Sequence, residues 1–309
     1  MIRLFNINDY TIDTSKLTGL HDPIVKDFEQ KIASFVGAKY ACGVSSATNA
    51  IFLALLDKDI TLTLPSVLPP VVCNAVLTSG NKLTFKDDIK WVGDSYILHD
   101  FGDYKIVDSA QKIVKNQFKQ EANPQDLMLF SFYPTKPIGS YDGGIVVSDD
   151  KDKIDHFKLM TMNGTVFNEK SWKREIIRPG YKMYLNAIQA YIANENLERL
   201  DEKYAALTKV RDRYNSEFDI KNDSFHLYRL NVEDRDSFLT KAREQNIEIG
   251  RHYEALHNNS IYAQKELKLV QSEIECRTTI SIPFHEKLSL SEIDKVIKLV
   301  KDHGYFKTT

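Results

Sequence analysis

Short apolar runs that alternate with helical or turn segments constrain the fold of this chain more than any other feature of its sequence. From about residue 59 onward these runs read TLTLP, KLTF, SYILHDF and YKIVDSA. Each has the length of a strand and is bounded by polar or turn-forming residues. This alternation is typical of an α/β domain in which helices flank a mainly parallel sheet.

The N-terminal part predicts a helix, a strand and a second helix. Asp22 followed by Pro23 is a typical helix start, and Gly37 supplies the stop. The next strand, residues 40–45, leads through the turn Ser46-Ala47-Thr48 into a helix. Because the first amides of a helix are free and carry the positive end of its dipole, this turn could hold a phosphate. Ser and Thr also cap helices without any ligand, and that alternative stays open.

The C-terminal part has a different character. Residues 184 to about 218 have the periodicity of one long amphipathic helix. After it, FHLYRLNV, a helical segment at 234–245, IEIGRHY, TTISIPF and a closing helix at 288–303 indicate a small α+β domain. We therefore expect a large domain over residues 1–200, which includes the start of the long helix, and a small domain over residues 201–309.

Composition excludes several classes of protein. The chain has 309 residues with 42% hydrophobic and 27% charged residues, the balance of an ordinary globular protein, and a net charge of −2. No tract dense in Lys and Arg suggests a nucleic-acid partner. The longest apolar run, residues 50–56, is too short to span a bilayer. The cysteines lack CxxC spacing and the histidines lack paired ligand spacing, so we expect a cytoplasmic protein without a metal site or a disulfide framework.

Residues 131–150, SFYPTKPIGSYDGGIVVSDD, place one lysine, Lys136, in a turn between two strand-like runs. The prolines and glycines of this segment favour turns over a helix. A lysine amine on a rigid turn at the edge of a sheet can form a Schiff base with a carbonyl, if burial or neighbours lower its pKa. Most lysines are solvated charges, so the turn alone does not establish this chemistry.

Asp108 ends the strand YKIVD, and Gln111 follows three residues later. A carboxylate at the end of a strand can pair with a protonated ring nitrogen, and the amide can reach a neighbouring oxygen. The alternative is an Asp that only caps the next turn. A phosphate turn, a strand-end Asp and a turn-borne Lys follow one another here in the order that fold-type-I pyridoxal phosphate (PLP) enzymes use.

The chain resembles the DegT-like sugar-nucleotide aminotransferases over nearly its whole length. The stretches that carry the resemblance are DFEQKIASFVGAKYACGVSSATNAIFLAL, IVDSAQ, SFYPTKPIGSYDGGIVVSDD, PGYKMYLNAIQAYIANENLERLDE and IGRHYEALH. The resemblance implies the fold-type-I PLP transferase architecture, an α/β large domain with a mainly parallel mixed sheet flanked by helices, plus a small C-terminal α+β domain. It also implies a homodimer with shared active sites.

The resemblance further implies a role for each matching residue. Lys136 would form the Schiff base with PLP and shuttle a proton, Asp108 would keep the ring nitrogen protonated, and Gln111 would touch the 3-oxygen side of the ring. The phosphate would be held by amides and hydroxyls of Ala47, Thr48 and Ser131. Ala47 stands where glycine is common in the family.

Two features depart from the family pattern. The family's GYNYRM segment supplies a phosphate contact from the neighbouring subunit, and this chain has GYKMY, in which Lys182 or Tyr184 would supply it. The chain is also short: LHDFG runs directly into the strand of Asp108, where relatives insert a helix. These differences leave the cofactor residues intact and would reshape the substrate pocket.

The expected activity is transfer of an amino group from glutamate to a nucleotide-linked 4-keto or 3-keto 6-deoxyhexose. One alternative is a PLP-dependent sugar dehydratase of the same fold, but such relatives carry His at the lysine position. Another is a non-catalytic relative that binds the cofactor or a sugar nucleotide. The joint presence of Thr48, Asp108, Gln111, Ser131 and Lys136 argues against it.

Overall fold

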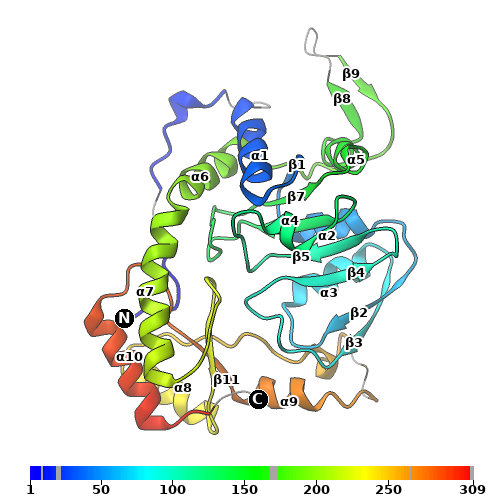
Figure 1. The fold of residues 1–309 in the computed structure, drawn as a ribbon. Helices are drawn as coiled ribbons and strands as arrows, with labels where there is room; N and C mark the ends of the chain where they lie inside the picture. Colours follow the sequence, from blue (N-terminus) through cyan, green and yellow to red (C-terminus); the bar gives the residue numbers. More distant parts are fainter. Residues whose placement is uncertain (8–9, 19–21, 168–172, 263, 265, 307–309) are drawn as a thin grey trace.

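A computed structural model describes residues 1–306 apart from 8–9, 19–21, 168–172, 263 and 265 (Figure 1). Its helices are α1 (Pro23–Val36), α2 (Ala47–Leu55), α3 (Pro70–Thr78), α4 (Gln117–Glu121), α5 (Lys151–Thr161), α6 (Ala187–Glu198), α7 (Leu200–Phe218), α8 (Arg235–Glu244), α9 (Val270–Thr278) and α10 (Leu290–His303). Its strands are β1 (Tyr40–Val44), β2 (Thr61–Pro65), β3 (Lys82–Lys86), β4 (Tyr96–Asp100), β5 (Lys105–Asp108), β6 (Leu127–Ser131), β7 (Gly144–Ser148), β8 (Thr165–Phe167), β9 (Arg174–Ile176), β10 (Tyr228–Asn231) and β11 (Thr279–Ile282). Within these ranges, no helix combines the length and the apolar character that crossing a membrane requires.

A five-stranded sheet in the order β1-β7-β6-β5-β4 forms the centre of the molecule. Side chains alternate between its two faces, so Leu127 and Leu129 of β6 belong to one apolar cluster while Met128 and Phe130 belong to another. Residues of α2, α3 and α5 complete the first cluster, and residues of α1 and α6 complete the second. The α/β class, with a mixed sheet flanked by helices, is therefore confirmed.

The expectation that this sheet is mainly parallel is wrong. Among its neighbouring strands only β5 and β6 run parallel, and a second parallel pair, β2–β3, forms a separate sheet. Strand β7 runs antiparallel to both of its neighbours, β1 and β6, and β4 runs antiparallel to β5, to which a short link of residues 101–104 joins it. Parallel neighbours need a crossover of about a dozen residues or more, so a link this short makes β4 and β5 an antiparallel hairpin.

The predicted long helix over residues 184–218 is two helices. A capping box at Asn186 starts α6, and the chain leaves the helical path at Arg199 before α7 begins. No Pro or Gly marks this break. Helix α6 packs against α1, which itself packs against β1 of the large sheet. Helix α7 packs against α10 of the C-terminal part (Figure 1). Ile188 of α6 is exposed in the single chain.

The C-terminal part has its own apolar cluster, built from α7, α8, α10 and the antiparallel strand pair β10–β11. The first residues of the chain join it: Ile2 bridges to Ile247, and the Leu4 carbonyl accepts a hydrogen bond from the Phe284 amide. In the other direction, Leu256 and Leu269 pack into the cluster beside the large sheet. The domain boundary at residue 200 stays a prediction, since contacts cross it both ways.

Candidate active site

A cavity of about 450 Å³ lies between the ends of the central strands and the C-terminal part. Six of the residues predicted from the sequence line it together: Ala47, Thr48, Asp108, Gln111, Ser131 and Lys136. They come from the start of α2, the end of β5, the end of β6 and the turn before β7. The fold thus brings residues separated by up to 89 positions in the sequence into one site.

A tight turn fixes the backbone around Lys136. The Lys136 amide donates to the Tyr133 carbonyl over 2.8 Å, and the Ser140 amide donates to the Phe132 carbonyl over 2.8 Å. Gly139 closes this turn, because a Cβ there would lie 2.4 Å from the Pro134 carbonyl oxygen. Only glycine fits at that position, and it sets the direction in which the turn presents Lys136.

Burial governs the charge of the lysine. Loss of hydration lowers the pKa of Lys136 to about 8, against the opposing effect of the Asp108 carboxylate. The Nε2 atom of His226 lies 3.1 Å from Lys136 Nζ. Burial, together with the nearby lysine, holds the pKa of His226 well below its usual range, so this imidazole is neutral and forms a hydrogen bond with Nζ. The uncharged amine of Lys136 is therefore far more populated near neutral pH than that of an ordinary lysine.

Asp108 is a buried carboxylate at the end of β5. One oxygen, Oδ1, accepts from the Ala110 amide over 3.0 Å, and the other, Oδ2, accepts from the Tyr96 hydroxyl over 2.9 Å. Burial raises the pKa of Asp108, while these two donors and the charge of Lys136 act in the opposite direction. The carboxylate thus depends on its donors to stay ionised.

Gln111 is held at both ends of its amide group. Its Oε1 accepts from the Gly93 amide over 2.8 Å, and its Nε2 donates to the Tyr253 hydroxyl over 3.0 Å. The Tyr253 ring stacks on Trp91 with centroids 6.2 Å apart and planes inclined by 3°. The amide therefore sits in a fixed orientation at the cavity wall.

The start of α2 lines one end of the cavity. The Ser46 hydroxyl accepts from the Asn49 amide over 3.2 Å, and Ala47 and Thr48 are the first two residues of the helix, where amides have no partner within the helix. Gly144 of β7 packs directly beneath: a Cβ there would lie 2.6 Å from the Ala47 nitrogen. With free helix-start amides at this end, an amine at Lys136 and a carboxylate at Asp108, the residues present fit the phosphate, the aldehyde and the ring nitrogen of PLP.

Lys182 and Tyr184 do not line this cavity. Lys182 forms a main-chain bridge with Met162, and Tyr184 forms one with Val44 of β1. The Lys182 side chain is exposed in the single chain. A contact of either residue with a cofactor would have to be made in another subunit.

Several lining residues had no functional signal in the sequence. Phe5 stacks on His226 with centroids 5.7 Å apart, and His252 meets Phe5 edge-on at 6.0 Å. Burial lowers the pKa of His252 to about 4. Phe5 and His226 were not predicted, whereas His252 and Tyr253 belong to the IGRHYEALH stretch of the resemblance.

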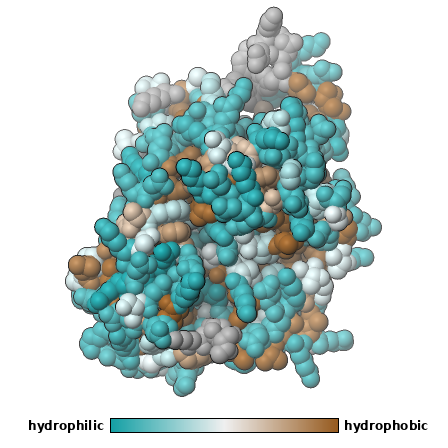
Figure 2. All heavy atoms as spheres, viewed as in Figure 1, coloured by the Kyte–Doolittle hydropathy of each residue, from teal (hydrophilic) through white to brown (hydrophobic). Residues whose placement is uncertain are grey.

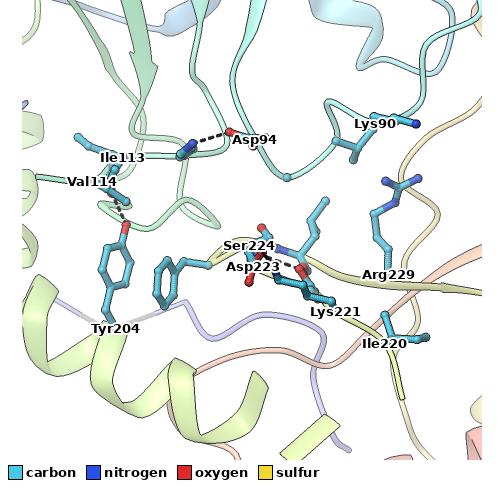
Figure 3. A pocket seen from close by; sticks show the side chains of 16 residues that line it. Lys90, Asp94, Ile113, Val114, Tyr204, Ile220, Lys221, Asp223, Ser224 and Arg229 are labelled. Atoms are coloured by element: carbon cyan, nitrogen blue, oxygen red, sulfur yellow. Dashed lines mark hydrogen bonds and ion pairs between the residues drawn. The ribbon is translucent and has the colours of Figure 1, made fainter. Parts of the chain in front are cut away.

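A second cavity of about 340 Å³, lined in part by Gly93, lies between residues 90–94 and 220–229 (Figure 3). Three of its basic side chains are neutralised by acidic partners: Lys112 by Asp94 at 2.7 Å, Lys221 by Asp223 at 3.5 Å, and Arg229 by Glu275. None of the predicted site residues lines it. The first cavity is therefore the candidate active site.

A sequence profile of the DegT/DnrJ/EryC1/StrS aminotransferase family matches residues 11–87 and 104–301. One curated relative, the UDP-4-amino-4,6-dideoxy-N-acetyl-beta-L-altrosamine transaminase of Campylobacter jejuni, is 27% identical over 362 aligned positions, which cover 96% of this chain and 94% of the relative. That alignment is longer than the chain itself, so the relative carries segments that this chain lacks.

Two solved structures share the fold. The aminotransferase TlmJ from Streptoalloteichus hindustanus has a TM-score of 0.80 at 19% identity, with 98% of each chain covered. Helicobacter pylori PseC, an aminotransferase involved in the biosynthesis of pseudoaminic acid, has a TM-score of 0.78 at 18% identity, with 97% of this chain and 98% of PseC covered. The likeness to these enzymes shows the fold, and the profile match over most of the sequence shows that the chain belongs to the DegT/DnrJ/EryC1/StrS aminotransferase family.

Proposed function

We propose that the protein is a PLP-dependent aminotransferase that moves an amino group from glutamate to a nucleotide-linked keto-deoxysugar, a 4-keto or 3-keto 6-deoxyhexose. The observation that carries this proposal is the buried amine of Lys136, with its pKa lowered to about 8, in one cavity with the Asp108 carboxylate. The name of the Campylobacter jejuni relative, a transaminase of a UDP-linked aminodideoxy sugar, supports the substrate class.

When bound, PLP supplies a conjugated ring that accepts the electron pair released at the substrate's carbon. The protein's own residues do the rest. Lys136 would attach the cofactor and, as a free amine, take the proton from the Cα of the amino donor. The hydrogen bond between His226 and Nζ would orient the amine. Asp108 would hold the proton on the ring nitrogen.

The remaining residues would position the cofactor. The amides of Ala47 and Thr48 and the hydroxyl of Ser131 would hold its phosphate, and Gln111 would lie beside the ring. Lys182 or Tyr184 would complete the phosphate site of a neighbouring subunit in a homodimer.

Exposed apolar side chains support the homodimer. Val71 and Tyr133 line the cavity and are about half exposed in the single chain, at 47% and 55%. Tyr141 and Ile188 are exposed as well. Elsewhere, the face shown in Figure 2 carries apolar residues in small groups among hydrophilic ones. Apolar side chains gathered at the rim of a site are typical of an interface.

We place the enzyme in the cytoplasm. All three cysteines are free thiols, and Cys42 and Cys73 are buried. Thiols that stay unpaired fit a reducing compartment. The nucleotide-sugar substrates proposed here are small molecules, and the balanced charge of the chain gives no support for a nucleic-acid partner.

The visible spectrum of the purified protein tests this function. With PLP bound through Lys136, we expect an absorption band that bleaches when glutamate is added and returns with a suitable keto sugar nucleotide. Lys136→Ala should abolish the band, and Lys115→Ala, which changes an exposed lysine, should retain it. A protein that binds no PLP would refute the enzyme proposal. A band unchanged by glutamate would refute glutamate as the donor and favour the non-catalytic alternative.

A further inference from the structure

We propose that Tyr96 is a positioning residue that acts on the cofactor through Asp108. Its hydroxyl donates to Oδ2 of Asp108 over 2.9 Å inside the protein. This inference rests on the proposed function, because it gives Tyr96 the task of keeping ionised the carboxylate that would hold the proton on the ring nitrogen.

The shortened link between β4 and β5 puts Tyr96 in this place. In the antiparallel hairpin, Tyr96 is the direct partner of Asp108. Directly opposite residues of an antiparallel pair point to the same face of the sheet, so the two side chains meet. Tyr96 belongs to residues 88–103, the interval that the family profile does not match. The donor is thus a feature of this chain's own abbreviated segment.

Tyr96 acts by stabilising the charged form of Asp108. Asp108 has two hydrogen-bond donors in the described structure, the Ala110 amide and the Tyr96 hydroxyl, of which only the second is a side chain. Burial raises the pKa of Asp108, and each donor counters that rise by stabilising the charged form. Burial and the neighbouring carboxylate raise the pKa of Tyr96 well above its usual range, so its hydroxyl keeps its proton.

The same short segment also fixes the orientation of the hydroxyl. The Tyr96 ring packs on Trp91 with centroids 4.6 Å apart, and Trp91 Nε1 donates to the Val67 carbonyl over 3.1 Å. Trp91 in turn stacks on Tyr253, which accepts from Gln111. Gly93, between the two aromatic residues, donates to Gln111 as well. The abbreviated segment therefore supports both side chains that would face the ring.

A titration of the protein without cofactor tests the first half of this inference. Carbon-13 labelling of the aspartate side chains, with Asp108→Asn to assign the signal, reports the ionisation of Asp108. Tyr96→Phe removes one oxygen and keeps the ring, and we expect it to move the midpoint of Asp108 to higher pH. The matched control is Tyr214→Phe, which removes a buried hydroxyl bonded to the Pro283 carbonyl and should leave the midpoint unchanged. An unchanged midpoint in Tyr96→Phe would overturn the inference.

Cofactor binding tests the second half. The affinity for PLP should fall as the pH drops through the pKa of Asp108, since the protonated acid cannot hold a protonated ring nitrogen. In Tyr96→Phe this fall should begin at a pH roughly one unit higher, the shift expected when a carboxylate loses one hydrogen-bond donor. In an Asp108→Asn background, Tyr96→Phe should have no further effect, because Tyr96 acts through the carboxylate.

The two proposals can fail separately. A wild-type protein that binds no PLP would refute the proposed function and the cofactor role of Tyr96 together, while the carboxyl titration would still decide whether Tyr96 acts on Asp108. If the wild-type protein binds PLP and responds to glutamate, but Tyr96→Phe binds PLP with the same pH dependence, only the inference about Tyr96 is overturned.

Discussion

Lys136 Nζ and His226 Nε2 lie 3.1 Å apart, although the two residues are separated by 90 positions in the sequence. Lys136 belongs to the turn before β7, and His226 precedes β10 of the C-terminal part. Because the imidazole is neutral, it forms a hydrogen bond with the lysine without adding a second positive charge to the site. A histidine of the C-terminal part thus contacts the amine of a lysine that lies in the turn before β7.

We expect His226→Phe to slow the reaction with glutamate on the order of 10-fold to 100-fold, because an amine without this hydrogen-bond partner is no longer held in one orientation. Phe keeps an aromatic ring against Phe5, which limits the structural disturbance. Rapid-mixing measurements of the visible band give the rate. His156→Gln, at an exposed position on α5, is the control and should react normally. An unchanged rate in His226→Phe would show that the contact has no role in the reaction.

The attachment of PLP to Lys136 should depend on pH with a midpoint near 8. Only the neutral amine attacks a carbonyl, and burial lowers the pKa of Lys136 to about 8. The rate should therefore rise with pH below about 8 and level off above it. An ordinary lysine, with a pKa of about 10.4, would show a rate that still rises well above pH 9. Following the visible band at fixed PLP concentration distinguishes the two profiles.

Asp108→Asn should move that midpoint further down. The Asp108 carboxylate stabilises the ammonium form of Lys136 and so raises its pKa. Without this carboxylate, the effect of burial is less opposed and the pKa of Lys136 falls further. A midpoint that stays near 8 would mean that the two groups do not interact across the cavity.

Six of the eight site residues expected from the sequence and the family resemblance lie in one cavity, whereas Lys182 and Tyr184 do not line it. Ala47, Thr48, Asp108, Ser131 and Lys136 each lie at a strand end, a helix start or a turn, where local signals are strong. Strands β5 and β6 are neighbours in the sheet, so the ends of these strands are close as soon as the sheet forms. Local structure therefore determined this part of the site.

Two features of the fold were missed for different reasons. The direction of β4 could have been read from the four positions 101–104, which are too few for a parallel crossover. The break at Arg199 could not have been predicted from the sequence, because helix-forming residues stand on both sides of it. The packing of α6 and α7 against different parts of the protein separates them. His226 and Phe5 likewise reach the cavity only through the packing of the C-terminal part.

Gly139→Ala should weaken cofactor binding, although Gly139 does not line the cavity. The added Cβ would lie 2.4 Å from the Pro134 carbonyl oxygen, so the turn that carries Lys136 has to move. We expect a loss of about 1–3 kcal/mol in the free energy of unfolding and a weaker visible band at a given PLP concentration. Gly80→Ala is the control. The φ of +86° at Gly80 strains an alanine, but no atom beyond the adjacent residues lies within 4 Å of the added Cβ, and the position is not in the turn that carries Lys136. If both variants bind PLP equally well, the turn tolerates the side chain.

Glu275→Gln should destabilise the C-terminal part strongly. Glu275 is buried, with its side chain 4% exposed, and it accepts from Arg229, from Asn231 over 2.9 Å and from Thr279 over 2.8 Å. Removing its charge leaves the Arg229 guanidinium largely buried without a counter-charge, which costs about 3–5 kcal/mol in comparable pairs. In urea unfolding, the control Asp302→Asn, which breaks the exposed pair Lys298–Asp302, should cost under about 1 kcal/mol. The double variant Arg229→Met with Glu275→Leu should recover much of the loss, because neither charge then remains buried. Equal, small effects in Glu275→Gln and Asp302→Asn would show that solvent reaches the Arg229 site.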